Sequence, residues 1–181
     1  ALYEMGVKSI ADLRRKEIFS TLPFETQLNL KYPVNRKLPW EFADRVAKLL
    51  PKDVMVLGSY RRKRPVIGDM DLLTTRRLED VMKEIKQKLD VVGEFATGDK
   101  RHAFIAKLHN TYFHVDLFNC SEEELPTATL HWTGSLFSNI RLRSAAIRLG
   151  MMLNQYGLYR NGVRVPVSSE RDIYKALGLE Y

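Results

Sequence analysis

Two aspartates, Asp69 and Asp71, are separated by one residue in segment 69–75, which is typical of a β-strand. Because side chains alternate between the two faces of a strand, both carboxylates point to the same side. Two like charges held so close raise each other's pKa and destabilise the fold unless a cation lies between them. The pair therefore predicts a site for a hard divalent cation.

A third aspartate, Asp116, lies among apolar residues in segment 111–118, which we expect to be an interior strand. An acidic side chain in such a place needs a functional reason. Three aspartates on adjacent strands would hold two metal ions. Oxygen ligands favour Mg²⁺, with Mn²⁺ as a substitute, over zinc. No zinc-site spacing is found among the histidines, His102, His109, His114 and His131.

A glycine followed by a hydroxyl group and a basic run lies upstream of the aspartates. We expect a buried strand over residues 53–58 that ends at Gly58, after which come Ser59 and the basic cluster of residues 61–64. A glycine here lets backbone N–H groups approach an anion, and the cluster adds positive charge. The segment predicts a phosphate-binding loop that is not a P-loop. Taken alone, each motif has a plainer alternative, an exposed strand edge or a solvated basic turn.

The composition excludes several classes of protein. The chain has 181 residues, 45% of them hydrophobic, and 29 Lys and Arg against 22 Asp and Glu give a net charge of +7. These values are those of a globular domain, not of a disordered or collagen-like chain, and the positive excess favours a polyanionic partner. The single cysteine, Cys120, cannot form an internal disulfide, which favours an intracellular protein. No apolar run is long enough to span a membrane, so we expect no membrane partner.

Hydrophobic periodicity predicts an α+β fold with a mixed β-sheet. Residues 2–31 are helix-like, and residues 31–39 are expected to be a linker. The further helices are expected over residues 39–50, 78–89, 136–149 and 170–177. The further strands are expected over residues 103–108 and 157–167, with hairpin turns at His109-Asn110 and Asn161-Gly162.

Together, these motifs resemble the signature of the family X DNA polymerases. The string Gly58-Ser-Tyr-Arg-Arg62, followed after six residues by Asp69-Met-Asp71, resembles the family's nucleotidyltransferase motif. Asp116 lies where the third catalytic aspartate belongs, and His131-Trp-Thr-Gly-Ser135 is similar to the family's Tyr-Phe-Thr-Gly-Ser motif. Residues 2–14 look like the end of a helix-hairpin-helix, and residues 169–181 are of the family's closing type. The resemblance covers essentially the whole chain.

The resemblance implies three parts: a helical DNA-binding segment (1–36), a nucleotidyltransferase palm (37–119) and a nucleotide-selecting α+β subdomain (120–181). It implies a template-directed DNA polymerase that adds dNMP from dNTP to a primer 3′-OH, with two Mg²⁺ ions or Mn²⁺ in their place. The partners would be dNTP and primer-template or gapped DNA, in the repair of short gaps or DNA ends, including base excision repair. We expect a monomer, located in the nucleus if the source is eukaryotic.

The resemblance also implies roles for single residues. Asp69 and Asp71 would bind both metals, and Asp116 would bind the metal that activates the primer 3′-OH. Arg143 would contact the DNA template. The residues implied to bind the incoming nucleotide are Gly58, Ser59, Arg62, Gly68, His131, Trp132, Gly134 and Asn139.

Three positions depart from the family's pattern. Trp40 stands where polymerase beta has a triphosphate-binding arginine. His131 replaces the usual tyrosine or glycine beside the sugar, and His114 replaces an arginine that is common beside the third aspartate. We therefore expect Asp116 to be oriented by other groups than in those relatives.

Two alternatives stay open at this point: a template-independent or other nucleotidyltransferase, and a non-catalytic DNA-binding scaffold. Terminal transferase has a long insertion between the two palm strands before the third aspartate. Here the link is only His109-Asn110, which favours template-directed synthesis.

The family's amino-terminal lyase domain, which holds a 5′-phosphate, has no counterpart in this sequence. We therefore expect weaker processivity on gaps than in the longer relatives, with equal filling of gapped and open templates in a primer-extension assay. A strong preference for a gap that carries a 5′-phosphate would contradict this expectation.

Overall fold

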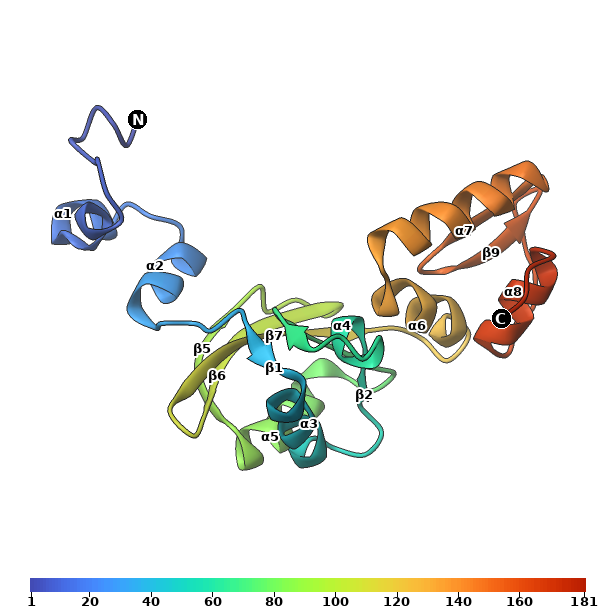
Figure 1. Ribbon diagram of the computed structural model, residues 1–181, viewed down its shortest axis with the longest axis horizontal. Helices are drawn as coiled ribbons and strands as arrows, with labels where there is room; N and C mark the ends of the chain where they lie inside the picture. The colour runs from blue at the N-terminus through green and yellow to red at the C-terminus, as the bar shows by residue number, and fades with distance from the viewer.

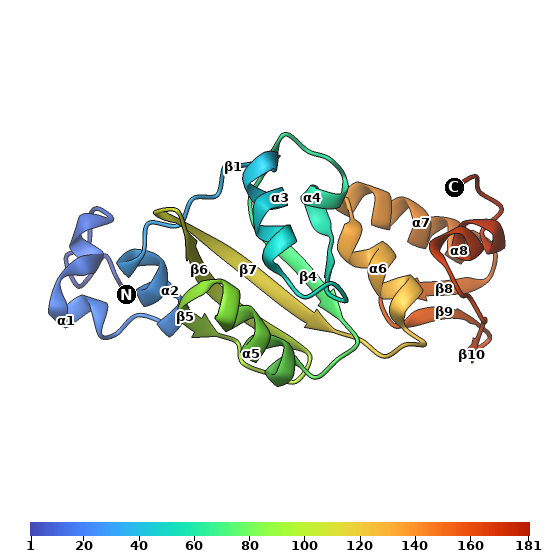
Figure 2. The ribbon, with the colours of Figure 1, turned by 90° about the horizontal axis from the view of Figure 1, so that it is seen from below.

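The computed structural model describes residues 1–181 and shows three parts in a row (Figures 1 and 2). Short helices form the N-terminal part, a five-stranded sheet lies in the middle, and a small unit with three strands carries the C-terminus. The central sheet contains both parallel and antiparallel pairs. The expected α+β class with a mixed sheet is confirmed.

The central sheet has the strand order β2-β4-β7-β6-β5. Only β4 and β7 pair in parallel, and the other neighbours are antiparallel. The parallel pair lies inside the sheet and is largely buried, as parallel strands usually are. The strands are β2 (Met55–Val56), β4 (Met70–Thr74), β5 (Asp90–Phe95), β6 (Arg101–Leu108) and β7 (Thr111–Asn119).

One face of this sheet packs against α3 (Trp40–Leu49) and α5 (Leu78–Lys88), as Figure 2 shows. Both helices present apolar residues at three- and four-residue intervals, the pattern of a helix with one buried face. Phe42 of α3 meets Phe113 of β7 edge to face, with ring centroids 5.5 Å apart. This face holds the largest core cluster, of 19 buried residues.

The opposite face is covered only at its two ends. At one end, Leu28 of α2 (Phe24–Lys31) packs on Ala103 and Ile105 of β6. At the other end, Ala128 of α6 (Leu125–Thr133) packs with Phe118 of β7. The acidic residues of β4 and β7 lie between these two covers.

Two tight turns were predicted correctly. His109 and Asn110 have φ values of 48° and 62° and join β6 to β7. Asn161 and Gly162, with φ values of 52° and 74°, join β9 (Gly157–Arg160) to β10 (Val163–Arg164). Positive φ at both central residues is what a two-residue hairpin turn requires.

The N-terminal part is helical, as expected, but in short pieces: η1 (Ala11–Arg14), α1 (Lys16–Phe19) and α2. The expected linker needs correction, because Leu38–Pro39 form β1, which pairs with β3 (Val66–Ile67). Pairing across the sequence, which periodicity does not report, orders this segment.

The C-terminal unit contains helix α7 (Leu136–Arg148) and helix α8 (Glu170–Ala176), both expected, together with α6 and β8 (Met151–Asn154), which were not. Threonine has a low helix propensity, so the threonines of α6 did not indicate a helix in the sequence. In the structure the hydroxyls of Thr127 and Thr133 bond to the preceding turn, the latter to the carbonyl of Thr129 at 2.6 Å. None of the helices has the length and apolar character that a membrane span requires.

The core packing leads to a prediction about stability. Phe113 is fully buried, so Phe113→Ala should lower the free energy of unfolding by about 3–5 kcal/mol. The matched control is Phe137→Ala in α7, because Phe137 is 77% exposed and its loss should change stability little. Urea denaturation measures both, and equal effects of the two substitutions would contradict the assignment of this core.

Candidate active site

The close approach of Gly58 to Asp71 shapes the site. Gly58 has a φ of +60°, and a Cβ built on it would lie 2.2 Å from Oδ2 of Asp71. Only glycine allows both this backbone conformation and this distance. The segment that follows was expected to be a loop, but its first residues form the short helix α4 (Gly58–Arg61). Ser59 lies half-buried in this turn.

The parallel pairing of β4 with β7 brings two of the aspartates together. Asp71 pairs directly with Asp116 in the register of these strands. The pKa of Asp71 is raised to about 7, first by burial, then by the charges of Asp116 and Asp69, and the nearby Arg62 lowers it. The site thus concentrates negative charge, as the D-x-D motif predicted.

Two arginines bind Asp69 and Asp116. Nη1 of Arg36 donates to Oδ1 of Asp69 at 2.5 Å. Nε and Nη2 of Arg101 donate to Oδ1 of Asp116 at 3.0 and 2.7 Å. Sequence reasoning missed both arginines, because neither stands at a spacing that indicates its partner. The strand predicted over residues 103–108 already pairs with β7 through the hairpin, and its extension to residue 101 could have found Arg101.

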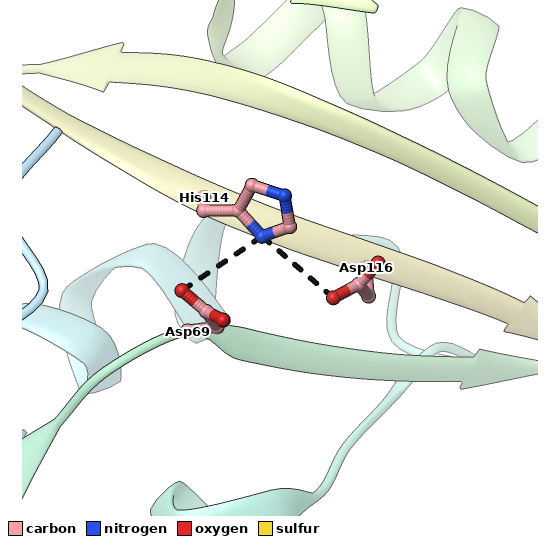
Figure 3. Close-up of side chains that lie close together, drawn as sticks. All are labelled: Asp69, His114 and Asp116. Atoms are coloured by element: carbon pink, nitrogen blue, oxygen red, sulfur yellow. Dashed lines mark ion pairs between the residues drawn. The ribbon is translucent and has the colours of Figure 1, made fainter. Parts of the chain in front are cut away.

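A buried histidine completes the cluster. Figure 3 shows His114 between Asp69 and Asp116, with its Nδ1 3.8 Å from Oδ1 of Asp69 and 3.6 Å from Oδ2 of Asp116. Ligand atoms of these three residues all lie within 4.8 Å of one another. They form a possible metal site, and Asp71 is not part of this group of three.

The basic cluster after Gly58 binds the C-terminal unit. Nη1 of Arg62 donates to the carbonyl of Thr133 at 2.6 Å. Nη1 of Arg61 donates to Oγ1 of Thr133 at 2.7 Å and to Oε1 of Glu170 at 2.6 Å. The side chains of both arginines bond to the protein through Nη1 alone, and Arg61 also forms an ion pair with Glu170, which Arg62 does not.

Two of the predicted glycines lie near arginines. Gly134 has a φ of +70°, and a Cβ there would lie 2.9 Å from Nη1 of Arg62. Gly68 directly precedes Asp69, and a Cβ there would lie 3.7 Å from the carbonyl oxygen of Arg36. Gly134 thus makes room for the bond between Arg62 and Thr133.

The predicted nucleotide-selecting residues lie together on α6 and α7. Nη2 of Arg143 lies 3.0 Å from Nδ1 of His131, and Nδ2 of Asn139 donates to the carbonyl of His131 at 2.9 Å. Burial, and then the charge of Arg143, lowers the pKa of His131. The ring of Trp132 stacks on Phe118, with centroids 3.7 Å apart. Phe118 is two residues after Asp116 on β7, so this stack links the group to the strand that carries Asp116.

Trp40 stands at the position where the resemblance leads one to expect an arginine. Its ring stacks on Tyr60 with centroids 5.2 Å apart, and its Nε1 donates to the carbonyl of Tyr60 at 3.0 Å. The Nζ of Lys63 lies 4.4 Å from the centre of the Trp40 ring. A cation–π contact thus keeps a positive charge at this place.

A mixed sheet carries an acidic cluster on its parallel strands, next to a glycine turn and arginines, which is the arrangement that the nucleotidyltransferase motif predicts. Residues 128–181 match the family model of the DNA polymerase beta thumb. These residues lie within the predicted C-terminal subdomain.

Two kinds of relative show the family. The chain is 31% identical over 151 residues to "Repair DNA polymerase X" from two isolates of African swine fever virus, which covers 80% of this chain and 87% of each relative. It is 30% identical over 125 residues to "DNA polymerase/3'-5' exonuclease PolX" of Bacillus subtilis, which covers 67% of this chain and 22% of that protein. The chain therefore belongs to the family X DNA polymerases, and the resemblance in its motifs is confirmed. It is a DNA-directed DNA polymerase of the repair type.

The raised pKa of Asp71 predicts a pH-dependent cost to stability in metal-free protein. Between about pH 4 and pH 7 the folded state binds this proton more tightly than the unfolded state does, so stability falls as the pH rises. Asp71→Asn removes the charge. With EDTA present, the variant should gain on the order of 2–4 kcal/mol over wild type from pH 4 to pH 8.

Urea denaturation across this pH range measures the difference between the two proteins. Added Mg²⁺ should reduce the difference at pH 8 by stabilising the wild type. A difference that does not change with pH would show that Asp71 ionises normally.

Proposed function

We propose that this protein is a template-directed DNA polymerase that extends a primer 3′-OH with dNMP at short gaps or DNA ends, by two-metal-ion catalysis. The observation that carries the proposal is the parallel register that sets Asp71 beside Asp116, with Asp69 at the same cluster. Its supports are the family membership and the match to the polymerase beta thumb.

The donors in the cluster fit divalent cations. Asp69, Asp71 and Asp116 supply hard oxygen ligands, which suit Mg²⁺ or Mn²⁺. The buried Nδ1 of His114 has no hydrogen-bond partner, as expected of an atom that faces a cation site. Bound ions would lower the pKa of the attacking hydroxyl and neutralise the leaving pyrophosphate.

The side chains around the cluster supply binding and proton transfer. Arg101 holds Oδ1 of Asp116, which leaves Oδ2 to bind the cation that would activate the primer 3′-OH for loss of its proton. Arg62 and the hydroxyl of Ser59 bind the triphosphate beside Gly58 and Gly68, since a guanidinium group suits phosphate oxygens.

Base and sugar selection is the proposed role of the group on α6 and α7. Trp132 and Gly134 would line the sugar and base of the incoming dNTP. Asn139 and Arg143 would reach the nascent base pair and the template. Their contacts with His131 hold both side chains in fixed positions, which suits residues that select a nucleotide.

The proposed partners are dNTP and primer-template or gapped DNA, bound by a monomer. The net charge of +7 favours a polyanion, and the basic residues of the first helical segment add to it: Arg14, Arg15 and Lys16. If the source is eukaryotic, we propose that the protein acts in the nucleus.

Primer extension tests the proposal. The substrate is a labelled hairpin with a short gap, incubated in Mg²⁺ with each dNTP singly, beside a single-stranded primer. Wild type should add only the complementary nucleotide. Asp116→Asn should lower the rate by about a thousandfold, as expected when several kcal/mol of metal-ion stabilisation are lost.

The matched control is Asp90→Asn, which removes an exposed carboxylate at the start of β5 and should leave extension unchanged. Addition without a template would assign the protein to the terminal transferase type. Salt-sensitive DNA binding without any incorporation would favour a scaffold and overturn the proposal.

A further inference from the structure

His114 is a buried histidine whose ring faces the carboxylates. It stands two residues before Asp116 on β7, so the two side chains share one face of the sheet. His114 is only 4% exposed, and its Nδ1 has no hydrogen-bond partner. A polar atom in this state costs free energy unless a ligand satisfies it.

The distances around Nδ1 are those of ligands that share a cation. Nδ1 lies 3.8 Å from Oδ1 of Asp69 and 3.6 Å from Oδ2 of Asp116, as drawn in Figure 3. Both distances are too long for a hydrogen bond. Ligands bonded to one ion at about 2.1 Å lie about 3 Å apart when adjacent and about 4 Å apart when opposite. The two distances from Nδ1 lie between these values.

The surroundings hold the imidazole in this orientation. The ring of Phe95 on β5 packs against it, with centroids 5.1 Å apart and the planes tilted by 39°. Ile105 of β6 is its direct partner in the strand register and is fully buried. Because the ring is buried and packs on Phe95, it is held with Nδ1 toward the carboxylates, as Figure 3 shows.

The charged neighbours allow a cation to enter. Arg101 binds Oδ1 of Asp116 and leaves Oδ2, the atom nearer His114. Arg36 binds Oδ1 of Asp69, and its side chain is half-exposed, so it can move into solvent when a cation takes its place.

We propose that Nδ1 of His114 is a nitrogen ligand of the divalent cation that Asp69 and Asp116 bind. This inference rests on the proposed metal-dependent function and adds a specificity to it. Mg²⁺ prefers oxygen ligands, whereas Mn²⁺ binds a site that contains a nitrogen ligand more tightly than Mg²⁺ does. A mixed nitrogen and oxygen site therefore prefers Mn²⁺ over Mg²⁺ more strongly than a site made of carboxylates alone.

Pulsed electron paramagnetic resonance of bound Mn²⁺ tests the proposal without any activity measurement. Wild type loaded with one equivalent of Mn²⁺ should show the ¹⁴N coupling of a directly coordinated imidazole. His114→Asn places an amide oxygen near the former Nδ1 position, so the coupling should disappear. The Mn²⁺ dissociation constant should rise about tenfold, the scale seen when a metal site loses a supporting group, and that of Mg²⁺ should change less.

The matched control is His102→Asn. His102 lies on the neighbouring strand β6, where its Nε2 is 3.0 Å from Oε1 of Glu94 and its ring contacts Phe104 on the other face of the sheet. This variant should keep both the nitrogen coupling and the preference for Mn²⁺. Circular dichroism and thermal unfolding check that each variant is folded.

A second measurement makes the test independent of how His114→Asn folds. Wild type labelled with ¹⁵N-histidine should show a ¹⁵N coupling in place of the ¹⁴N coupling. A spectrum unaffected by the label would overturn the proposal.

The outcomes separate the two levels of inference. If wild type binds Mn²⁺ without nitrogen coupling, and Asp116→Asn abolishes that binding, the carboxylate site stands and the role of His114 is refuted. If Mn²⁺ binding does not depend on the aspartates, both the metal site of the proposed function and the role of His114 are refuted.

Discussion

The repulsion between carboxylates that the β-sheet holds together is the constraint on which the rest of the site depends. The register of β4 with β7 fixes Asp71 beside Asp116, and the core on the other face of the sheet holds that register in place. A core that buries 19 residues can support such an unfavourable cluster. Fold stability and function therefore oppose each other at this point, as often happens at active sites.

The surrounding residues answer this constraint in three ways. Gly58 gives the room that Asp71 needs, since no other residue fits beside its carboxylate. Arg36 supplies positive charge to Asp69, and Arg101 supplies it to Asp116. The helices α2 and α6 cover the two ends of the face and leave the acidic residues between them. Each device is local, but together they keep a charged cluster inside a folded sheet.

Sequence reasoning reached the parts of this arrangement that depend on local rules. Strand alternation and a glycine before a basic run were enough to single out Asp69, Asp71 and Gly58. The apolar residues around Asp116 in an expected interior strand singled out the third aspartate. Arg36 was beyond reach, because it is 33 residues from Asp69. Arg101 lies just outside the strand that was predicted to pair with the strand of Asp116, so its contact was missed as well. The missed elements have similar causes. β5 contains Gly93 and a register shift, and helix α6 contains threonines that only tertiary packing makes helical.

The bond from Arg62 to the carbonyl of Thr133 joins the turn after Gly58 to the end of α6. One guanidinium thus serves two parts of the molecule that are 71 residues apart in the chain. An anion that drew Arg62 away from Thr133 would remove one of the bonds between this turn and the C-terminal unit, and a movement of that unit would change how Arg62 is held. Thermodynamic linkage requires this coupling to act equally in both directions. The orientation of the C-terminal unit is therefore coupled to the position of Arg62 in the turn after Gly58.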